Sequence, residues 1–153
     1  MKVARAYTLT SEDSQDLAQE ILMQAWRSLS NFDRRATAAT WFYRVALHTA
    51  MNWHRKDKPR RSHQQPFINV QDVPSEQADQ AEQTQQREIV EQLYRAIQKL
   101  PKFDAALVLL YLEELSYREM AEVLGISENN VGVKLNRAKK ALAELMKGAS
   151  SEP

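Results

Sequence analysis

Residues 116–145 read SYREMAEVLGISENNVGVKLNRAKKALAEL, and this stretch predicts two helices joined by a tight turn. Gly125 lies where the first helix must end and the chain must change direction. Glycine suits such a position because it adopts a positive φ without a steric clash of a Cβ atom. Ser127 follows with a hydroxyl that can cap the next helix. The stretch therefore predicts a helix-turn-helix.

The second helix of this stretch has one apolar and one polar face. Its apolar residues recur at helical spacing, at Val131, Leu135, Ala138 and Leu142. The opposite face carries Asn129, Val133, Asn136, Arg137 and Lys140. Polar and basic groups opposite a buried stripe are typical of a recognition helix in a DNA groove. The alternative is an ordinary helical hairpin with a solvated charged face.

The composition excludes several classes of protein. The 153-residue chain has no cysteine, which excludes disulfides and thiolate metal sites. No apolar run approaches the roughly 20 residues that span a bilayer, and the N-terminus lacks a signal-peptide core, so we expect a cytoplasmic protein. The three histidines do not form a ligand set with carboxylates, and no nucleophile or phosphate-loop motif occurs. We therefore expect no metal, no cofactor and no enzymatic activity.

Charge is distributed unevenly along the chain although its net value is only +1. Lysine and arginine cluster at 55–61 and return at 134–147, whereas residues 62–86 contain acidic residues and no lysine or arginine. This pattern predicts two basic DNA-facing surfaces with an acidic connector between them. Helical periodicity covers 11–29, 40–56, 87–100 and 103–113, and no strand pattern is visible. We predict an all-α fold with two small helical domains, 1–58 and 87–148, joined by a flexible linker at 59–86.

The first long helix is predicted to begin near Ser11, because Thr10 and Asp13 have the spacing of a capping box. Two rows of apolar residues on this helix are predicted to form the core. The first row is Leu17, Ile21, Ala25 and Leu29, and the second row is Ala18, Leu22 and Trp26. The other face is acidic and rich in amides, and it carries Asp13, Asp16, Gln19, Glu20 and Gln24. By itself, such a face is most simply solvated.

The helix predicted at 40–56 also has two faces. Its inward residues are Phe42, Val45, Ala46, Thr49 and Trp53, and its outward stripe is Arg44, His48, Asn52 and Arg55. The loop before it contains Asn31, Asp33, Arg34 and Arg35. Cations beside aromatic rings suit unpaired DNA, since phosphates need positive charge and unstacked bases need a ring to stack on. We nevertheless predict Trp26, Trp41 and Trp53 mainly as core residues, with Trp41 the best candidate for a base platform.

Two segments, in this order, resemble the bacterial RNA polymerase sigma factors of the extracytoplasmic-function (ECF) type, in the sigma-seventy-like superfamily. Residues 13–56, DSQDLAQEILMQAWRSLSNFDRRATAATWFYRVALHTAMNWHRK, resemble region two of that family. Residues 115–142, LSYREMAEVLGISENNVGVKLNRAKKAL, resemble region four, its promoter-binding helix-turn-helix. Relatives usually have a longer helix ahead of the acidic signature. If the start of this chain is truncated or misassigned, residues 2–7 are expected to be the end of that helix.

The resemblance implies a function and a set of partners. A sigma factor binds core RNA polymerase and directs promoter-specific initiation, and an anti-sigma factor commonly silences it. The acidic helix implied to dock on polymerase carries Asp13, Asp16, Gln19 and Glu20. The residues implied to bind the minus-ten element are Asn31, Arg34, Arg35, Trp41, Arg44, His48, Asn52, Arg55 and Lys56. Those implied to bind the minus-thirty-five element are Asn129, Asn130, Val133, Lys134, Asn136, Arg137 and Lys140.

Two other functions remain open from the residues alone. One is a stand-alone helix-turn-helix regulator that binds duplex DNA and dimerises through its first half. The other is a truncated sigma-like decoy that binds only polymerase or an anti-sigma factor. Gly132 is a further open point, because glycine within the recognition helix costs up to about 1 kcal/mol of helix stability yet permits close approach of the backbone to DNA.

Overall fold

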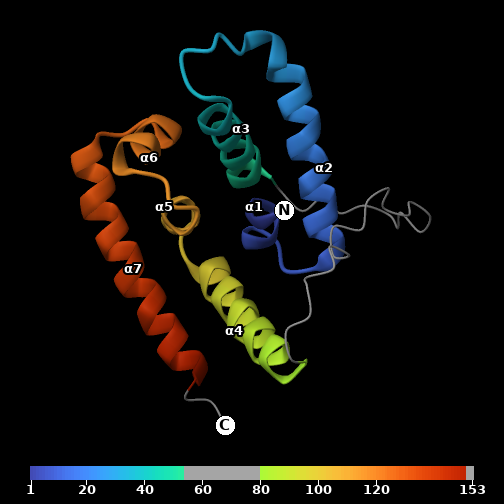
Figure 1. Ribbon diagram of the computed structural model, residues 1–153, viewed down its shortest axis with the longest axis vertical. Helices are drawn as coiled ribbons and strands as arrows, with labels where there is room; N and C mark the ends of the chain where they lie inside the picture. The colour runs from blue at the N-terminus through green and yellow to red at the C-terminus, as the bar shows by residue number, and fades with distance from the viewer. Residues whose placement is uncertain (54–79, 151–153) are drawn as a thin grey trace.

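The computed structural model describes residues 1–53 and 80–150, and all of its regular elements in these ranges are helices (Figure 1). In chain order they are α1 (Lys2–Ala6), α2 (Ser11–Ser28), the short 3-10 helix η1 (Leu29–Asn31), α3 (Ala38–Asn52), α4 (Gln80–Lys99), α5 (Lys102–Leu112), α6 (Tyr117–Leu124) and α7 (Glu128–Ser150). The all-α prediction is confirmed. Residues 54–79, which include most of the predicted linker, lie outside the described ranges.

Local capping sets where the helices of the first half begin. The Thr10 hydroxyl accepts a hydrogen bond from the Asp13 backbone N–H at 3.1 Å, as the spacing predicted, and α2 begins at Ser11. The Thr37 hydroxyl accepts one from the Thr40 N–H at 3.2 Å, so α3 begins slightly earlier than predicted. Both bonds satisfy N–H groups that a helix leaves unpaired in its first turn.

Helix α4 begins at Gln80, whereas the sequence was expected to remain irregular up to residue 86. The error has a physical reason. Residues 80–86 lack apolar periodicity because most of this segment, about two turns long, is exposed, yet glutamine, alanine and glutamate are favourable helix formers. The Thr84 hydroxyl also donates to the Gln80 carbonyl at 2.8 Å, which keeps it within the helix.

Burial follows the first predicted row only as far as Ala25. Leu17, Ile21 and Ala25 are buried, as expected, but Leu29, the last member of that row, is 50% exposed, so its assignment to the core is wrong. In contrast, Leu22 is 56% exposed and Trp26 is 78% exposed, so the prediction that they belong to the core is wrong. Helix α2 packs on α1 and α3 along a single narrow stripe, and no other described element covers its second row.

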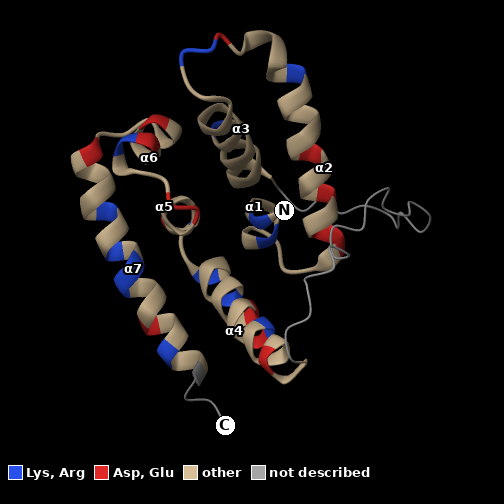
Figure 2. Ribbon diagram, in the orientation of Figure 1, with Lys and Arg blue, Asp and Glu red and all other residues tan. Residues whose placement is uncertain are grey.

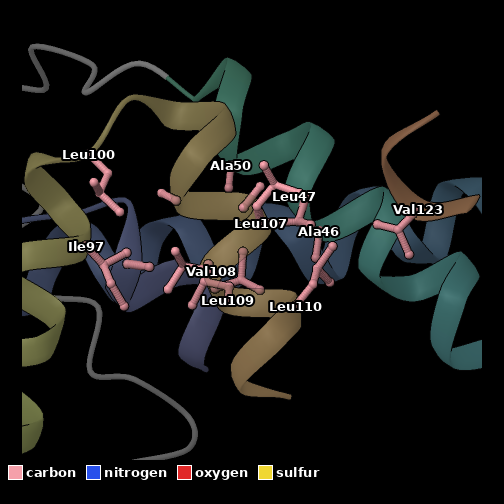
Figure 3. Close-up of a cluster of buried hydrophobic side chains, with 14 of the residues drawn as sticks. Ala46, Leu47, Ala50, Ile97, Leu100, Leu107, Val108, Leu109, Leu110 and Val123 are labelled. Atoms are coloured by element: carbon pink, nitrogen blue, oxygen red, sulfur yellow. The ribbon is translucent and has the colours of Figure 1, made fainter. Parts of the chain in front are cut away.

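A single hydrophobic core extends through both halves of the chain (Figure 3). Helix α5 lies at its centre, with α7 on one side and α1 and α3 on the other (Figure 1). The six residues of α5 from Ala105 to Leu110 are all buried, because α1, α3, α4, α6 and α7 all pack against this helix. Side chains of α3, including Leu47, therefore share one apolar cluster with Leu107 of α5 (Figure 3).

Polar contacts also connect the two halves around this core. Lys2 of α1 donates to a carboxylate oxygen of Glu113 at 2.6 Å, and Tyr43 of α3 donates to the other oxygen at 3.2 Å. The hydrogen bond from Lys2 lowers the pKa of Glu113 and, reciprocally, raises the pKa of Lys2. The Gln98 amide donates to the backbone carbonyls of Arg5 and Thr8, at 2.8 and 2.7 Å. The ends of α1 and α3 are thus bound to the second half.

Candidate nucleic-acid interface

The helix-turn-helix is defined by three local features. Ser116 and Glu119 form a reciprocal capping box at the start of α6, with hydrogen bonds of 3.1 and 2.8 Å. Gly125 ends α6 with a left-handed φ of 70°, and the Ser127 hydroxyl then accepts from the Asn130 N–H at 3.1 Å. The predictions for Gly125 and Ser127 are confirmed. The capping box was missed, although its S-x-x-E signal is present in the sequence.

The apolar stripe of α7 fixes which face of the helix points outward. Val131, Leu135 and Ala138 are fully buried, and α7 packs against α4, α5 and α6. Lysine and arginine positions recur along the ribbon of α7 (Figure 2). Each α7 residue assigned to DNA from the sequence is exposed: Asn129, Asn130, Val133, Lys134, Asn136, Arg137 and Lys140. The structure thus places this predicted set on one accessible surface.

The Tyr117 ring of α6 packs against α7 at Gly132. A Cβ atom at this position would lie 3.4 Å from Cε2 of Tyr117, which is an ordinary van der Waals distance, so the ring lies directly beside the glycine. A shallow hollow opens beside this contact on the exposed face. Its lining residues are Tyr117, Glu128, Asn129, Gly132, Val133 and Asn136. Sequence reasoning did not identify Tyr117, because nothing local indicates that its ring reaches α7.

Two lysines of α7 lie over aromatic rings. The ammonium of Lys139 is 4.3 Å from the ring centre of Tyr111, and that of Lys134 is 5.7 Å from the ring centre of Phe103. Such contacts between a cation and a ring are favourable and limit where the side chain can move. The positive charge along this side of α7 is therefore partly held in place by α5.

The loop between α2 and α3 presents exposed polar groups, and one acidic side chain of the loop bonds back to it. Asn31, Arg34 and Arg35 are exposed, and the Asp33 carboxylate accepts from the Arg35 backbone at 3.1 Å and from its guanidinium at 3.2 Å. Arg34 has a left-handed φ of 63°. This turn brings together the loop cations that were predicted from the sequence.

Trp41 is half-buried near the start of α3, and its ring contacts a neighbouring ring. Its ring centre lies 5.2 Å from that of Phe32, with a tilt of 42° between the planes. Aromatic pairs favour such tilted arrangements. Phe32 was not identified from the sequence, and its contact leaves Trp41 neither fully in the core nor free to rotate.

The outward stripe of α3 is exposed to solvent, but two of its side chains are engaged in hydrogen bonds. Arg44, His48 and Asn52 lie on one face of the helix, as predicted. The Arg44 guanidinium, however, donates to the backbone carbonyl of Glu122 in α6 at 2.7 Å. The Asn52 amide donates to the His48 carbonyl at 2.8 Å and so turns back onto its own helix. Arg55 and Lys56, the other two members of this group, lie outside the described residues.

The acidic face of α2 lies apart from both of these surfaces (Figure 2). Gln19 is exposed, whereas Asp13, Asp16 and Glu20 are half-buried. The Gln24 amide donates to the Glu20 carboxylate at 3.0 Å. This face borders the exposed second row of α2, so acidic and apolar groups lie side by side on one helix.

The described part of the chain was also searched for metal sites and membrane spans. Within residues 1–53 and 80–150, no cluster of histidine, aspartate and glutamate has the arrangement of a metal site. In the same ranges, no helix is long and apolar enough to cross a membrane.

Comparison with known protein families matches both halves of the chain. The family described as Sigma-70 region 2 matches residues 1–60, and Sigma-70, region 4 matches residues 85–142. Among solved structures, CnrH in complex with the cytosolic domain of CnrY is similar in fold, with a TM-score of 0.60, 22% identity and coverage of 95% of this chain and 79% of that one. RpoE in complex with the anti-sigma factor NepR from Bartonella quintana is also similar in fold, with a TM-score of 0.58 and 16% identity. The match covers 95% of this chain and 88% of that one.

Similar full-length relatives are also found. RNA polymerase sigma factor YlaC of Bacillus subtilis is 33% identical over 146 residues, which cover 92% of this chain and 82% of the relative. The RNA polymerase sigma-H factor of Pseudomonas aeruginosa is 31% identical, and the match covers 86% of this chain and 72% of the relative. ECF RNA polymerase sigma factor SigM of Mycobacterium tuberculosis is 29% identical, with coverage of 95% and 70%. The chain therefore belongs to the sigma-70 family of RNA polymerase sigma factors, in its ECF group, and acts in transcription initiation.

Proposed function

We propose that this sigma factor reads its promoter with two separate surfaces, one on α7 and one formed by α3 and the loop before it. The observation that carries the proposal is the exposed polar face of α7, held outward by a fully buried apolar stripe. In this proposal, residues 1–58 act on the minus-ten element and residues 87–148 on the minus-thirty-five element. The segment between them connects the two units.

The side chains of α7 divide into base readers and phosphate contacts. Arg137 and Asn136 are proposed to read base edges, since arginine pairs with guanine and asparagine with adenine in the major groove. Lys134 and Lys140 are proposed to contact phosphates, which set position rather than sequence, and Asn129, Asn130 and Val133 complete the surface. The exposure of all seven residues supports this division.

The minus-ten surface is proposed to consist of Asn31, Arg34, Arg35, Trp41, Arg44, His48 and Asn52, with Arg55 and Lys56. The loop takes up an unstacked base, while the stripe on α3 holds the strand by its phosphates. Support comes from the exposure of the loop cations and from the pairing of Trp41 with Phe32, which presents a fixed ring beside them.

In this proposal, promoter binding requires the packing of α1 and α3 on α4, α5 and α6 to open. The two promoter elements lie roughly 25 base pairs apart, which at about 3.4 Å each is roughly 85 Å of duplex. Helix α7 has 23 residues and is therefore only about 35 Å long. In the described arrangement α3 packs on α5 and α6, with Arg44 bound to the Glu122 carbonyl, and in this proposal the two surfaces are then held too close together to reach both elements at once. We infer that the described arrangement is the closed form of the factor.

Helix α2 is proposed to dock on the largest subunit of core RNA polymerase through Asp13, Asp16, Gln19 and Glu20. The exposed apolar side chains of Leu22 and Trp26 beside this face support an interaction with protein rather than with DNA. Of the structural neighbours named above, RpoE was solved with the anti-sigma factor NepR, and CnrH with the cytosolic domain of CnrY. We propose that an anti-sigma factor also binds this chain.

In-vitro transcription with purified core polymerase tests the proposal. Discrete initiation that appears only with this protein, over a library of promoter fragments, is the expected result. Association with core polymerase without initiation would instead favour a decoy, and dimeric binding to DNA without polymerase would favour a stand-alone regulator. The double substitution Asp16→Lys with Glu20→Lys should weaken association by charge reversal, and unchanged association would contradict the docking surface.

A further inference from the structure

We propose that Val133, Gly132 and Tyr117 together form a reader for the methyl group of a thymine in the minus-thirty-five element. This inference rests on the proposed function of α7. Val133 is 46% exposed, although every position that α7 needs for its core lies on the opposite stripe. It is an apolar side chain placed among Asn129, Asn136 and Arg137, which flank it at helical spacing.

A lone exposed valine needs no explanation, but this one has an apolar neighbour. Tyr117 is also 46% exposed, and its ring lies against Gly132, where a Cβ would come within 3.4 Å of Cε2. These three residues line the hollow together with the polar residues Glu128, Asn129 and Asn136. Because residue 132 has no side chain, the hollow remains open toward the face that is proposed to meet DNA.

The chemistry of the hollow selects one base. The C5 methyl of thymine is the only apolar group that a base pair presents in the major groove. A valine side chain and a tyrosine ring edge can contact that methyl by dispersion, whereas they offer nothing to the polar edges of guanine or cytosine. The amides of Asn129 and Asn136 on the rim can hydrogen bond to adenine, and the Glu128 carboxylate can accept from cytosine.

The test removes the methyl group from the DNA. The full-length protein is bound to core polymerase, and a promoter is first selected from randomised duplexes. Each thymine of its minus-thirty-five element, on either strand, is then replaced in turn by deoxyuridine, which lacks only the methyl. At one position, initiation at limiting holoenzyme should fall about threefold to fivefold, as expected for loss of one buried methyl group.

Matched variants connect this loss to the hollow. Val133→Ala should lower initiation by a similar factor and reduce the deoxyuridine penalty at that position below about twofold, because both changes remove the same contact. Gly132→Ala, which favours the helix, should fill the hollow and also diminish the penalty. Val90→Ala is the control: Val90 is 40% exposed on α4, and its replacement should leave the penalty unchanged.

The possible outcomes separate this inference from the proposed function. Initiation on the unmodified promoter with no deoxyuridine penalty at any position would overturn the methyl reader and leave the sigma assignment intact. A penalty that persists in full in Val133→Ala would also overturn it. A selected minus-thirty-five element without thymine would do the same, and failure to initiate at all would overturn both proposals.

Discussion

The polar faces of α7 and α3 have similar sequence patterns but different surroundings. The α7 face is exposed along its length and is backed by residues that are fully buried. The α3 stripe has Arg44 bound to α6, and its Asn52 amide is turned onto its own helix. One DNA-facing surface is thus preformed, whereas the other has to be released. Periodicity alone does not distinguish these two situations, because it describes one helix and not its neighbours.

The largest expected effect tests whether the two regions fold as one unit. Leu107 is fully buried in the shared core, so Leu107→Ala should lower the free energy of unfolding by about 2–5 kcal/mol. Because α3 and α7 both depend on α5, we expect one cooperative transition in urea, seen equally by tryptophan fluorescence and circular dichroism. The tryptophans all lie in the first half of the chain.

The control for this variant is Leu112→Ala, since Leu112 is exposed on the same helix and should cost far less stability. Two separate transitions in the Leu107→Ala protein, one reported by the tryptophans and one not, would show that the halves are energetically independent.

Changes to the exposed polar face of α7 should alter which promoter sequence is preferred. Arg137→Ala should cost about 1–3 kcal/mol of binding at cognate promoters and relax selection at one base pair, measured by initiation from a randomised minus-thirty-five element. Arg95→Ala, an exposed arginine on α4, serves as the control. An equal loss on all sequences would make Arg137 a phosphate contact instead.

The polar stripe of α3, where Arg44 is bound to α6, should also affect the stability of the free protein. Arg44→Ala removes a hydrogen bond between α3 and α6 and should lower the free energy of unfolding by about 0.5–1.5 kcal/mol. His48→Ala, on the same stripe, should stay within about 0.5 kcal/mol of the parent. Equal stabilities of the two variants in urea denaturation would argue against the closed form.

The smallest effect concerns Glu113, which joins α1 and α3 to the second half. Its pKa is lowered mainly by the hydrogen bond from Lys2, so its contribution to stability is complete above its ordinary pKa. That contribution is lost as the pH falls below the ordinary pKa and through the lowered pKa, and it should amount to less than about 1 kcal/mol because the Lys2 side chain is largely open to solvent. Glu113→Gln should flatten this part of the stability profile, measured by urea denaturation at each pH. A profile unchanged by the substitution would contradict the role of the pair.

The helix-turn-helix could be predicted closely because its signals are local. Gly125 and Ser127 fix the turn through their own backbone and hydroxyl groups, and the apolar stripe of α7 has a clear period. The outward residues of α7 followed from the same period. These features need no knowledge of the rest of the chain.

Features that depend on distant partners were not predicted. Trp26 was expected in the core, but whether a helix row is buried depends on which element covers it, and none of the described elements does so. The contacts of Arg44 with α6 and of Tyr117 with Gly132 also join residues from different elements. Nothing in the local sequence indicates such pairings, so they emerged only from the structure.

The position of α1 in the shared core has a consequence for synthesis on the ribosome. Val3, Ala4 and Ala6 are made well before α4 and α5, which are two of the helices that pack on α1. The emerging first half therefore exposes apolar surface until α5 has left the exit tunnel, and such surface is what chaperones bind. Ribosome-bound chains that stop before residue 102 should accordingly remain incompletely folded and sensitive to proteolysis.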